Sequence, residues 1–196
     1  MEEMELSAVI LAGGKASRYG GIPKSLIQIK GRTIIANNLQ VLSTIFSEIF
    51  IIANEPEIFS FNNDVLVYPD LIPGHGPLSG IHSALSRISN SAAFIFACDM
   101  PNLRQDVMES QLAFYQRNPG LIIIPITERG IEPLHGIYPK AAFTDVERLL
   151  KMYDNPKIRS LFSQYPTLFM RFEDSALARR VFYNVNTPDD LSSLLI

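Results

Sequence analysis

The chain has 196 residues, 47% of them hydrophobic and 19% charged; this composition can bury a full core and excludes an intrinsically disordered chain. Its 17 basic and 20 acidic side chains give a net charge of −3, so no nucleic-acid partner and no anionic membrane partner is expected. The only cysteine, Cys98, cannot form an internal disulfide, which fits a reducing compartment. The acidic start is unlike a signal peptide, and no apolar run approaches the ~18 residues of a membrane span. We therefore expect a cytoplasmic protein with one domain over residues 1–196.

Short apolar runs alternate with segments of helical periodicity along the chain. Strands are predicted over residues 8–11, 49–53, 65–68, 92–98 and 121–124, and helices over residues 33–45, 78–88 and 103–115. The predicted strands are apolar throughout, as in a parallel sheet that is covered on both faces. The alternation predicts an α/β fold with a doubly wound, mostly parallel sheet in an α/β/α sandwich. The less regular region after residue 133, strand-like at 134–138 and helical at 141–151, is expected to form the far edge of the same domain.

A glycine-rich loop follows the first predicted strand. Residues 11–24 read Leu-Ala-Gly-Gly-Lys-Ala-Ser-Arg-Tyr-Gly-Gly-Ile-Pro-Lys. Glycines let backbone N–H groups turn toward an anion, and Arg18 and Lys24 add positive charge. The spacing is neither that of a Walker P-loop nor that of the G-x-G-x-x-G fingerprint. The loop therefore indicates a phosphate site outside those two classes, with a solvated basic loop as the alternative.

Polar side chains also follow three other predicted strands, at the ends where ligands bind in open α/β sheets. Asp99 ends an apolar strand, and its hard carboxylate oxygens suit Mg²⁺, which takes one or two carboxylates together with substrate phosphates. Helix capping is the alternative for Asp99. Asp70 and Asn54 end two further strands, where nucleotide contact competes with a role in a local turn. Cys98 lies on a predicted buried strand, which favours an unreactive thiol.

Several segments together resemble a known family. Leu-Ala-Gly-Gly at 11–14, Ser-Arg-Tyr-Gly at 17–20 and Lys24 resemble the signature loop of nucleotidyltransferases that make NDP-sugars and related pyrophosphates. The supporting segments are Tyr68-Pro69-Asp70, Gly76-Pro77-Leu78-Ser79-Gly80, Cys98-Asp99-Met100-Pro101, Glu132-Pro133-Leu134-His135-Gly136-Ile137-Tyr138 and Asn184-Val185-Asn186-Thr187-Pro188-Asp189-Asp190-Leu191. In this combination, from about residue 7 to about residue 192, the chain is most similar to the molybdenum cofactor guanylyltransferases.

The resemblance implies a Rossmann-like nucleotidyltransferase fold and a reaction. GMP passes from GTP to the terminal phosphate of molybdenum-molybdopterin, with Mg²⁺ on Asp99 and pyrophosphate as the leaving group. A molybdoenzyme or a cofactor chaperone would receive the product. The implied catalytic residues are Arg18, Lys24 and Asp99. The implied nucleotide contacts are Leu11, Ala12, Gly13, Gly14, Lys24, Asn54, Asp70, Gly76, Pro77, Leu78 and Asp99, and those of the second substrate are His135, Asn184 and Asn186.

One departure from the family pattern leaves alternatives open. Ile22 and Pro23 precede Lys24, where many cofactor guanylyltransferases have an acidic residue. Proline at this place is common in relatives that use CTP, UTP or dTTP, so a nucleotidyltransferase using CTP or another NTP is one alternative. A nucleotide- or cofactor-binding accessory protein without turnover is another. The alternative for His135 is a structural role, and that for Asn184 and Asn186 is local turn and capping hydrogen bonds.

Overall fold

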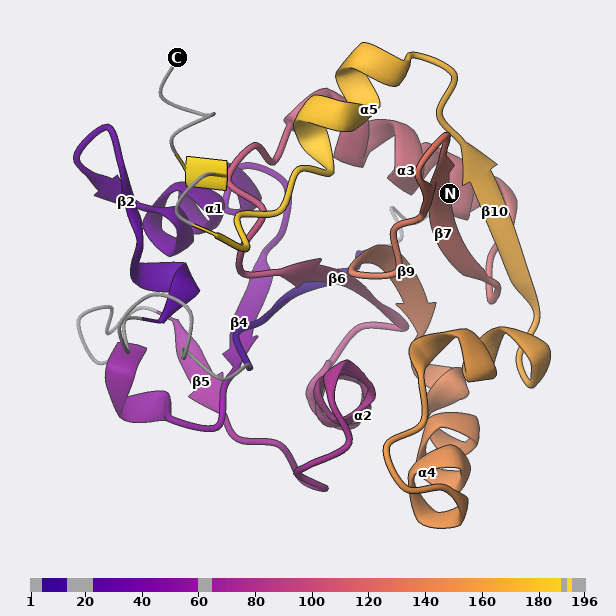
Figure 1. The fold of residues 1–196 in the computed structure, drawn as a ribbon. Coiled ribbons are helices and arrows are strands. Elements are labelled where there is room, and N and C mark those ends of the chain that lie inside the picture. Colours follow the sequence, from indigo (N-terminus) through magenta and orange to yellow (C-terminus); the bar gives the residue numbers. More distant parts are fainter. Residues whose placement is uncertain (1–4, 14–22, 60–64, 188–189, 192–196) are drawn as a thin grey trace.

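The computed structural model describes residues 5–13, 23–59, 65–187 and 190–191 (Figure 1). Its main sheet has the strand order β10-β7-β9-β6-β1-β4-β5, with β8 paired to β7. The strands of this sheet are β1 (Ser7–Leu11), β4 (Glu48–Ile52), β5 (Leu66–Tyr68), β6 (Ala92–Ala97), β7 (Ile122–Thr127), β8 (Gly130–Ile131), β9 (His135–Pro139) and β10 (Thr167–Arg171). A small ribbon pairs β2 (Gln28–Ile29) with β3 (Arg32–Thr33). The predicted doubly wound, mostly parallel sheet is confirmed.

Strand β9 is the exception to the parallel arrangement. The pairs of β1 with β4 and β6, of β4 with β5, and of β7 with β10 are parallel. Strand β9 lies between β6 and β7 and runs antiparallel to both. Because β6 and β7 thus point the same way, their carboxyl ends lie at the same edge of the sheet. The chain enters β9 at that edge as well.

Helices cover both faces of the sheet (Figure 1). They are α1 (Ile34–Leu42), α2 (Pro77–Arg87), α3 (Gln105–Arg117), α4 (Phe143–Met152) and α5 (Ser175–Val181). Short 3-10 turns are η2 (Lys24–Leu26), η3 (Pro56–Phe59), η4 (Lys140–Ala142) and η5 (Ile158–Ser163). Side chains of α1 and α3 pack in one hydrophobic cluster and those of α2 and α4 in another.

Alternate residues of the central strand β1 divide between these two clusters. Ala8 and Ile10 pack with α1 and α3, whereas Val9 and Leu11 pack with α2. Side chains of a strand point to opposite faces in turn, so a strand that is buried on both sides must be apolar at every position. This explains why the alternating polar pattern of a half-exposed strand is missing from the sequence. The predicted α/β/α sandwich is confirmed.

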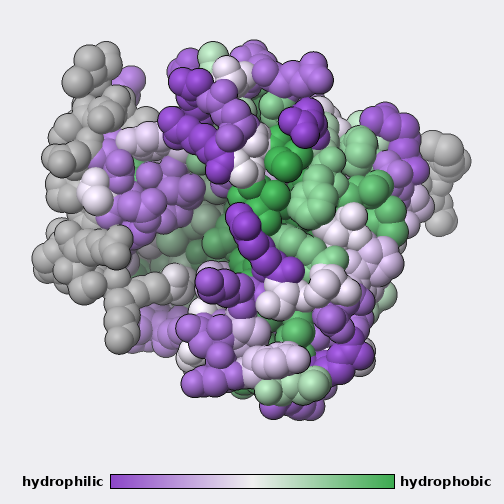
Figure 2. All heavy atoms as spheres, turned by 45° about the vertical axis from the view of Figure 1, so that its right-hand side comes forward, coloured by the Kyte–Doolittle hydropathy of each residue, from purple (hydrophilic) through white to green (hydrophobic). Residues whose placement is uncertain are grey.

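The outer surface is mixed in character. Figure 2 shows hydrophobic side chains in a band across the middle of one face, with hydrophilic side chains above and below it. Phe169 of β10 and Tyr153 after α4 are among the large hydrophobic residues that are exposed. Within the described ranges, the structure contains no helix of the length and apolarity that crossing a membrane requires.

Candidate active site

The carboxyl ends of four parallel strands form one row of candidate residues. Backbone hydrogen bonds continue past the strand ends, from Ala12 N to Ile52 O (2.8 Å), from Ala53 N to Tyr68 O (2.9 Å) and from Cys98 N to Leu11 O (3.2 Å). These bonds fix the residues that directly follow β1, β4 and β6. The row therefore runs, in the order of the sheet, from Asp70 after β5 through Asn54 and Gly13 to Asp99 after β6.

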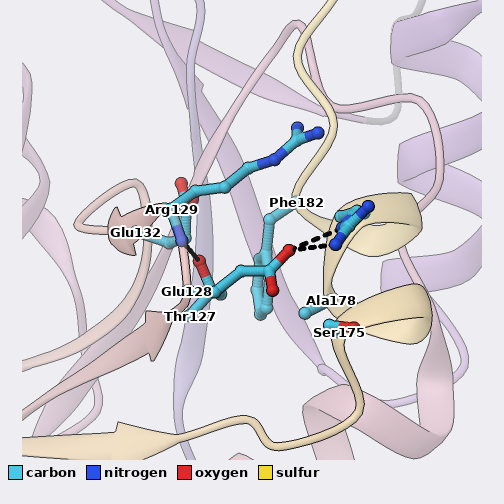
Figure 3. Close-up of a pocket in the computed structure, with 8 residues that line it drawn as sticks. Thr127, Glu128, Arg129, Glu132, Ser175, Ala178 and Phe182 are labelled. Atoms are coloured by element: carbon cyan, nitrogen blue, oxygen red, sulfur yellow. Dashed lines mark hydrogen bonds and ion pairs between the residues drawn. The ribbon is translucent and has the colours of Figure 1, made fainter.

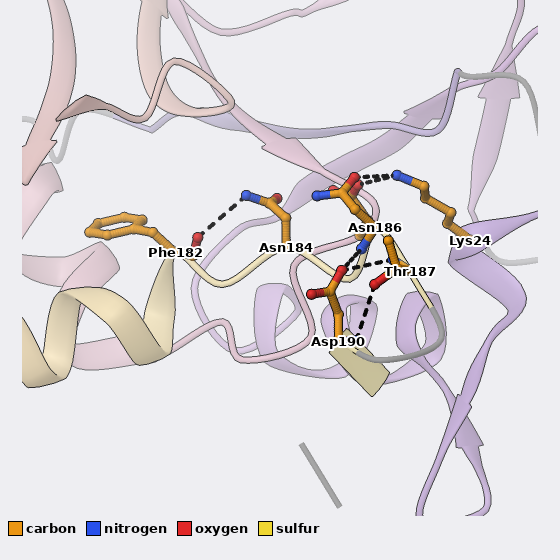
Figure 4. A network of polar contacts seen from close by, with 7 residues as sticks. Lys24, Phe182, Asn184, Asn186, Thr187 and Asp190 are labelled. Carbon is orange, nitrogen blue, oxygen red and sulfur yellow. Dashed lines mark hydrogen bonds and ion pairs between the residues drawn. The ribbon is translucent and has the colours of Figure 1, made fainter. Parts of the chain in front are cut away.

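Lys24 joins the two ends of the chain at this row (Figure 4). It begins η2, and its Nζ donates to Asp99 Oδ2 at 3.1 Å and to Asn186 Oδ1 at 2.5 Å. The backbone N–H of Val185 donates to the carbonyl oxygen of Asp99 at 2.9 Å. The Lys24 and Asp99 side chains are 25% and 17% exposed, so the ion pair remains open to a ligand while water screens it only in part. A positive charge that is held in place in this way can stabilise negative charge on a bound phosphate group.

Asn186 is held in place by a reciprocal capping arrangement. Asp190 Oδ2 accepts from the backbone N–H groups of Asn186 (2.8 Å) and Thr187 (2.7 Å), and Thr187 Oγ1 accepts from Asp190 N at 3.3 Å (Figure 4). The hydrogen bond from the backbone of Asn186 is the main cause of the lowered pKa of Asp190. Asn184 makes a local bond instead, from Nδ2 to Phe182 O at 3.3 Å. The structure thus brings Asn186, but not the Asn184 amide, into contact with Lys24.

Asp70 presents an unsatisfied carboxylate at the far end of the row. Its backbone N–H donates to Asn54 Oδ1 at 3.4 Å, and its Oδ1 is buried without a hydrogen-bond partner among the described residues. Burial raises the pKa of Asp70, against the effects of Asn54 and of the Arg87 charge. An unpaired buried polar atom is costly, so a ligand with an N–H or O–H group would relieve it. A Cβ at Gly13 would lie 4.0 Å from Asn54 Nδ2, which places Gly13 beside this pair.

The loop before α2 has a backbone conformation that lets a ligand approach its main chain closely. Gly76 is the N-cap of α2 with φ +64°, a conformation that favours glycine, and Pro77 follows at the start of the helix. Two buried hydroxyl groups of α2 accept backbone N–H groups of this loop, Ser79 Oγ from His75 (3.2 Å) and Ser83 Oγ from Leu71 (2.8 Å). Gly76 and Pro77 are exposed.

The leucines expected to contact the nucleotide face the core. The Leu78 side chain is fully buried, so that only its backbone could meet a ligand. Leu11 packs on α2, where a Cβ at Gly80 would lie 3.0 Å from two of its side-chain carbons. The close approach of helix and strand at Gly80 holds the Gly76 loop next to the end of β1.

His135 does not lie at the site, and the prediction that it contacts the second substrate is corrected here. Its side chain is 0% exposed, and its ring meets Phe94, Phe96 and Phe182 edge to face, with centroids 5.0–5.3 Å away. Neither ring nitrogen has a hydrogen-bond partner among the described residues. Burial lowers the pKa of His135 to about 4, so the ring is neutral. It is an internal histidine of β9.

The surroundings of Cys98 and Asp99 limit the chemistry that these two side chains can perform. Burial, together with the Asp99 charge, raises the pKa of Cys98 to about 12, so its thiol stays protonated, as expected. Within the described ranges, no three His, Cys, Asp or Glu side chains are close enough together to hold a metal ion. Asp99 is the carboxylate that stands beside the Lys24 charge.

Comparison with known proteins assigns the chain to a family. A family model described as the MobA-like NTP transferase domain matches residues 8–168. The chain belongs to this family. It is therefore a nucleotidyltransferase, and the resemblance seen in the sequence is confirmed.

The similar proteins cover almost the whole chain. A probable molybdenum cofactor guanylyltransferase from Natranaerobius thermophilus is 36% identical, with 95% of this chain and 93% of the relative covered. One from Carboxydothermus hydrogenoformans is 37% identical, with 97% and 95% covered. The crystal structure of molybdopterin-guanine dinucleotide biosynthesis protein A from Archaeoglobus fulgidus is similar in fold, with a TM-score of 0.81 and 24% identity over 96% of each chain.

Two predicted residues of this MobA-like domain, Arg18 and Gly14, lie outside the described residues, so their expected roles stay predictions. One residue of the site network, Asp190, was not predicted. Its signal is present in the sequence, because Thr187 and Asp190 have the Ser/Thr-x-x-acid spacing of a capping box. That spacing predicts the start of a helix. It does not show that the side chain of the preceding residue, Asn186, accepts a hydrogen bond from Lys24 near the other end of the chain.

Asp190 offers a test of this positioning. We expect Asp190→Ala to lower the turnover number of nucleotidyl transfer by about 10-fold, because the Asn186 backbone loses its anchor and Lys24 loses a fixed partner. The matched control is Asp174→Ala, since Asp174 caps α5 through Ala176 N and Leu177 N away from Lys24. Equal turnover numbers in the two variants would show that Asp190 is only a helix cap.

Proposed function

We propose that this chain transfers GMP from GTP to the terminal phosphate of molybdopterin in its molybdenum form, releasing pyrophosphate and forming a guanine dinucleotide of the cofactor. The names of the relatives, molybdenum cofactor guanylyltransferases, indicate the substrates. The observation that supports the chemistry is the Lys24 ammonium, 3.1 Å from Asp99 at the carboxyl edge of the sheet. This is where an open α/β sheet binds its ligands.

In this proposal the triphosphate lies against Lys24 and the backbone after β1. Gly13 and, from the sequence, Gly14 and Arg18 complete the phosphate contacts. Asp70 and Asn54 contact the nucleoside, and the buried Oδ1 of Asp70 gains the donor that it lacks among the described residues. The backbone at Ala12, Gly76 and Pro77 lines the rest of the nucleotide site. Asn186 faces the second substrate, with Asn184 beside it on the same segment.

A divalent metal fits this site. Asp99 bonds to Lys24 through Oδ2, whereas its Oδ1 has no hydrogen bond within the described ranges, so one carboxylate oxygen is available for Mg²⁺. One protein carboxylate with waters and substrate phosphates is an ordinary ligand set for this ion. Bound on Asp99, Mg²⁺ would neutralise charge on the triphosphate and orient it. Lys24 adds charge neutralisation that needs no metal.

The transfer needs positioning and charge more than acid–base catalysis. An oxygen of the molybdopterin phosphate attacks the α-phosphorus of GTP, and the bond from that phosphorus to the bridging oxygen of pyrophosphate breaks in line. The attacking phosphate is largely ionised at pH 7, with a second pKa of about 6, so no general base is required. Lys24 stabilises the charge that develops in the transition state, and no covalent intermediate with the protein forms.

Use of CTP in place of GTP is the alternative that has an observation of its own in its favour. Pro23 precedes Lys24, as in relatives that use pyrimidine nucleotides. The 2-C-methyl-D-erythritol 4-phosphate cytidylyltransferase from Thermus thermophilus has a similar fold, with a TM-score of 0.68 and 18% identity over 98% of each chain. The alternative is CMP transfer from CTP on the same site.

Pyrophosphate release from GTP, CTP, UTP and ATP, each with molybdopterin and Mg²⁺, separates these functions. We expect selective use of GTP, and a thermal shift to accompany it, because a ligand at 100 times its Kd adds about 2.7 kcal/mol to native stability. Pyrophosphate from CTP alone would identify a cytidylyltransferase. GTP binding without pyrophosphate from any acceptor would instead identify an accessory protein.

We propose that residues 1–196 act as one domain in the cytoplasm, where a reduced Cys98 and a cytosolic supply of GTP are compatible with the reaction. A molybdoenzyme or a chaperone would take the product directly. Nucleic acid and membrane have no part in this function.

A further inference from the structure

A small cavity lies beyond the carboxyl end of β7, on the side of Asp99 opposite to Asp70. The turn between β7 and β8 forms one wall, and α5 forms the other (Figure 3). Its volume is about 10 Å³, close to the space of one water molecule. The residues that line it include Glu128, Arg129, Glu132, Arg179 and Phe182.

One carboxylate of this cavity has no hydrogen-bond partner among the described residues. Glu128 is paired with Arg179, whose Nε and Nη2 lie 2.6 and 2.5 Å from Glu128 Oε1. The carboxylate of Glu132 makes no hydrogen bond to any described residue, and its only resolved charge interaction is with Arg129. Burial raises the pKa of Glu132 to about 7, against the effect of Arg129. A half-buried carboxylate that destabilises the folded chain when ionised, yet is open to a cavity, is a candidate for ligand binding.

The position of this carboxylate relative to Lys24 follows from the sheet. Leu134 O accepts from Ala97 N at 2.9 Å, and His135 pairs with Phe96, so Leu134 lies beside the end of β6. Two residues earlier, the backbone N–H of Glu132 donates to Pro125 O of β7 at 2.9 Å, so Glu132 lies on the β7 side. Two strand spacings, about 10 Å, separate β6 from β7. Phe182 lines the cavity and its carbonyl oxygen accepts from the Asn184 amide. The segment from 182 to 186 thus leads from the cavity to Lys24.

The proposed product has the same hydrogen-bonding edge at both of its ends. Guanine and a pterin each present an amino N–H and a ring N–H side by side, which one carboxylate accepts together. Asp70 lies at one end of the row, and Glu132 lies beyond its other end at Asp99. The phosphate site at Asp99 therefore has a carboxylate on each side. An amino group at a ring edge is about the size of the water that the cavity accommodates.

We propose that the Glu132 carboxylate accepts the paired N–H groups of the pterin ring of the second substrate, with the nucleoside on the Asp70 side of the site. This inference rests on the proposed function for the identity of that ring. Glu132 is then a specificity residue. An anion would face this carboxylate, and a metal cation would face Arg129 and Arg179, which leaves a neutral donor edge as the fitting ligand.

The first test compares Glu132→Gln with wild type in steady-state pyrophosphate release. A glutamine side chain has one acceptor oxygen, and its NH2 group would face the second N–H group of the pterin edge, so we expect the KM for molybdopterin to rise at least about 10-fold, while the KM for GTP changes less than about twofold. Glu173→Gln is the matched control, because Glu173 is exposed between β10 and α5, outside the cavity. An unchanged KM for molybdopterin, or equal rises for both substrates, would overturn the proposal.

A second measurement works without turnover. Titration of the fluorescent probe 6-hydroxymethylpterin should give a Kd at least about 10-fold higher for Glu132→Gln than for wild type at pH 7.5. Because the Glu132 carboxyl has a pKa of about 7 beside Arg129, Glu128 and Arg179, binding to wild type should weaken as the pH falls from 8 to 6. The variant should lack that dependence. Equal Kd values would overturn the Glu132 site, whereas a wild type that binds the pterin but releases no pyrophosphate would contradict only the proposed reaction.

Discussion

Replacement of Lys24 by methionine should lower the turnover number with GTP and molybdopterin by about 100-fold or more. The ammonium group that touches both Asp99 and Asn186 is lost, and with it a preorganised charge at the transferring phosphate. Asp99→Asn should have an effect of similar size, because the side chain loses its charge toward Lys24 and toward the Mg²⁺ proposed to bind there. Initial rates at saturating GTP and Mg²⁺ measure both effects.

The controls for this prediction are a distant lysine and the nucleotide affinity. Lys157→Met removes an exposed ammonium group before η5 and should leave the turnover number within about twofold. The two site variants should still melt cooperatively and should still bind GTP, since Asp70, Asn54 and the Gly76 loop are intact. Near-normal turnover in both Lys24→Met and Asp99→Asn would show that the chemistry takes place elsewhere.

Acid should destabilise the fold through His135, by about 3 kcal/mol between pH 6.5 and pH 4. Burial lowers the pKa of His135 from 6.5 to about 4 in the folded state. Between these two pKa values His135 binds a proton in the unfolded chain but not in the folded chain. The stability is therefore complete above pH 6.5 and is lost as the pH falls toward 4. The cost is close to its full size because the ring is completely buried.

Urea unfolding of His135→Leu at several pH values isolates this effect. Leucine keeps an apolar contact with the three phenylalanines and removes two unpaired ring nitrogens, so stability at pH 7.5 should not fall by more than about 1 kcal/mol. The difference in free energy of unfolding between variant and wild type should then grow in favour of the variant as the pH falls. His75→Gln serves as the control for loss of a histidine that is only partly buried. A variant with the same pH slope as wild type would rule out His135 as the acid-sensitive group.

The fold was predictable from the sequence where neighbouring elements decide it. Apolar strands at 8–11, 49–53, 65–68 and 92–98, with helical patterns at 33–45, 78–88 and 103–115 along the same part of the chain, predict a parallel sheet covered on both faces. Polar residues at the ends of these strands necessarily share one edge. Asp70, Asn54 and Asp99 were found in this way, and the structure places them in one row.

Distant pairing was not predictable. The segment at 134–138 is predicted to be a strand, but nothing in its composition shows that it runs antiparallel between β6 and β7. Because β9 is buried on both faces, alternation could not show that His135 points into an aromatic cluster instead of toward a ligand. The contact of Lys24 with Asn186 likewise depends on how the last part of the chain returns across the sheet.

Because the last part of the chain completes the surroundings of Lys24, the contacts of the site form in a particular order while the chain is synthesised. Lys24 is 75 positions from Asp99 and 162 positions from Asn186. As the chain leaves the ribosome, β1, β4 and β6 can pair early, whereas the Lys24 environment waits for Asn186 and the cap at Asp190. Contacts of such long separation form late because a large loop must close first. A nascent chain can therefore form most of its sheet well before the ion pair of Lys24 and Asp99 reaches the geometry seen in the folded protein.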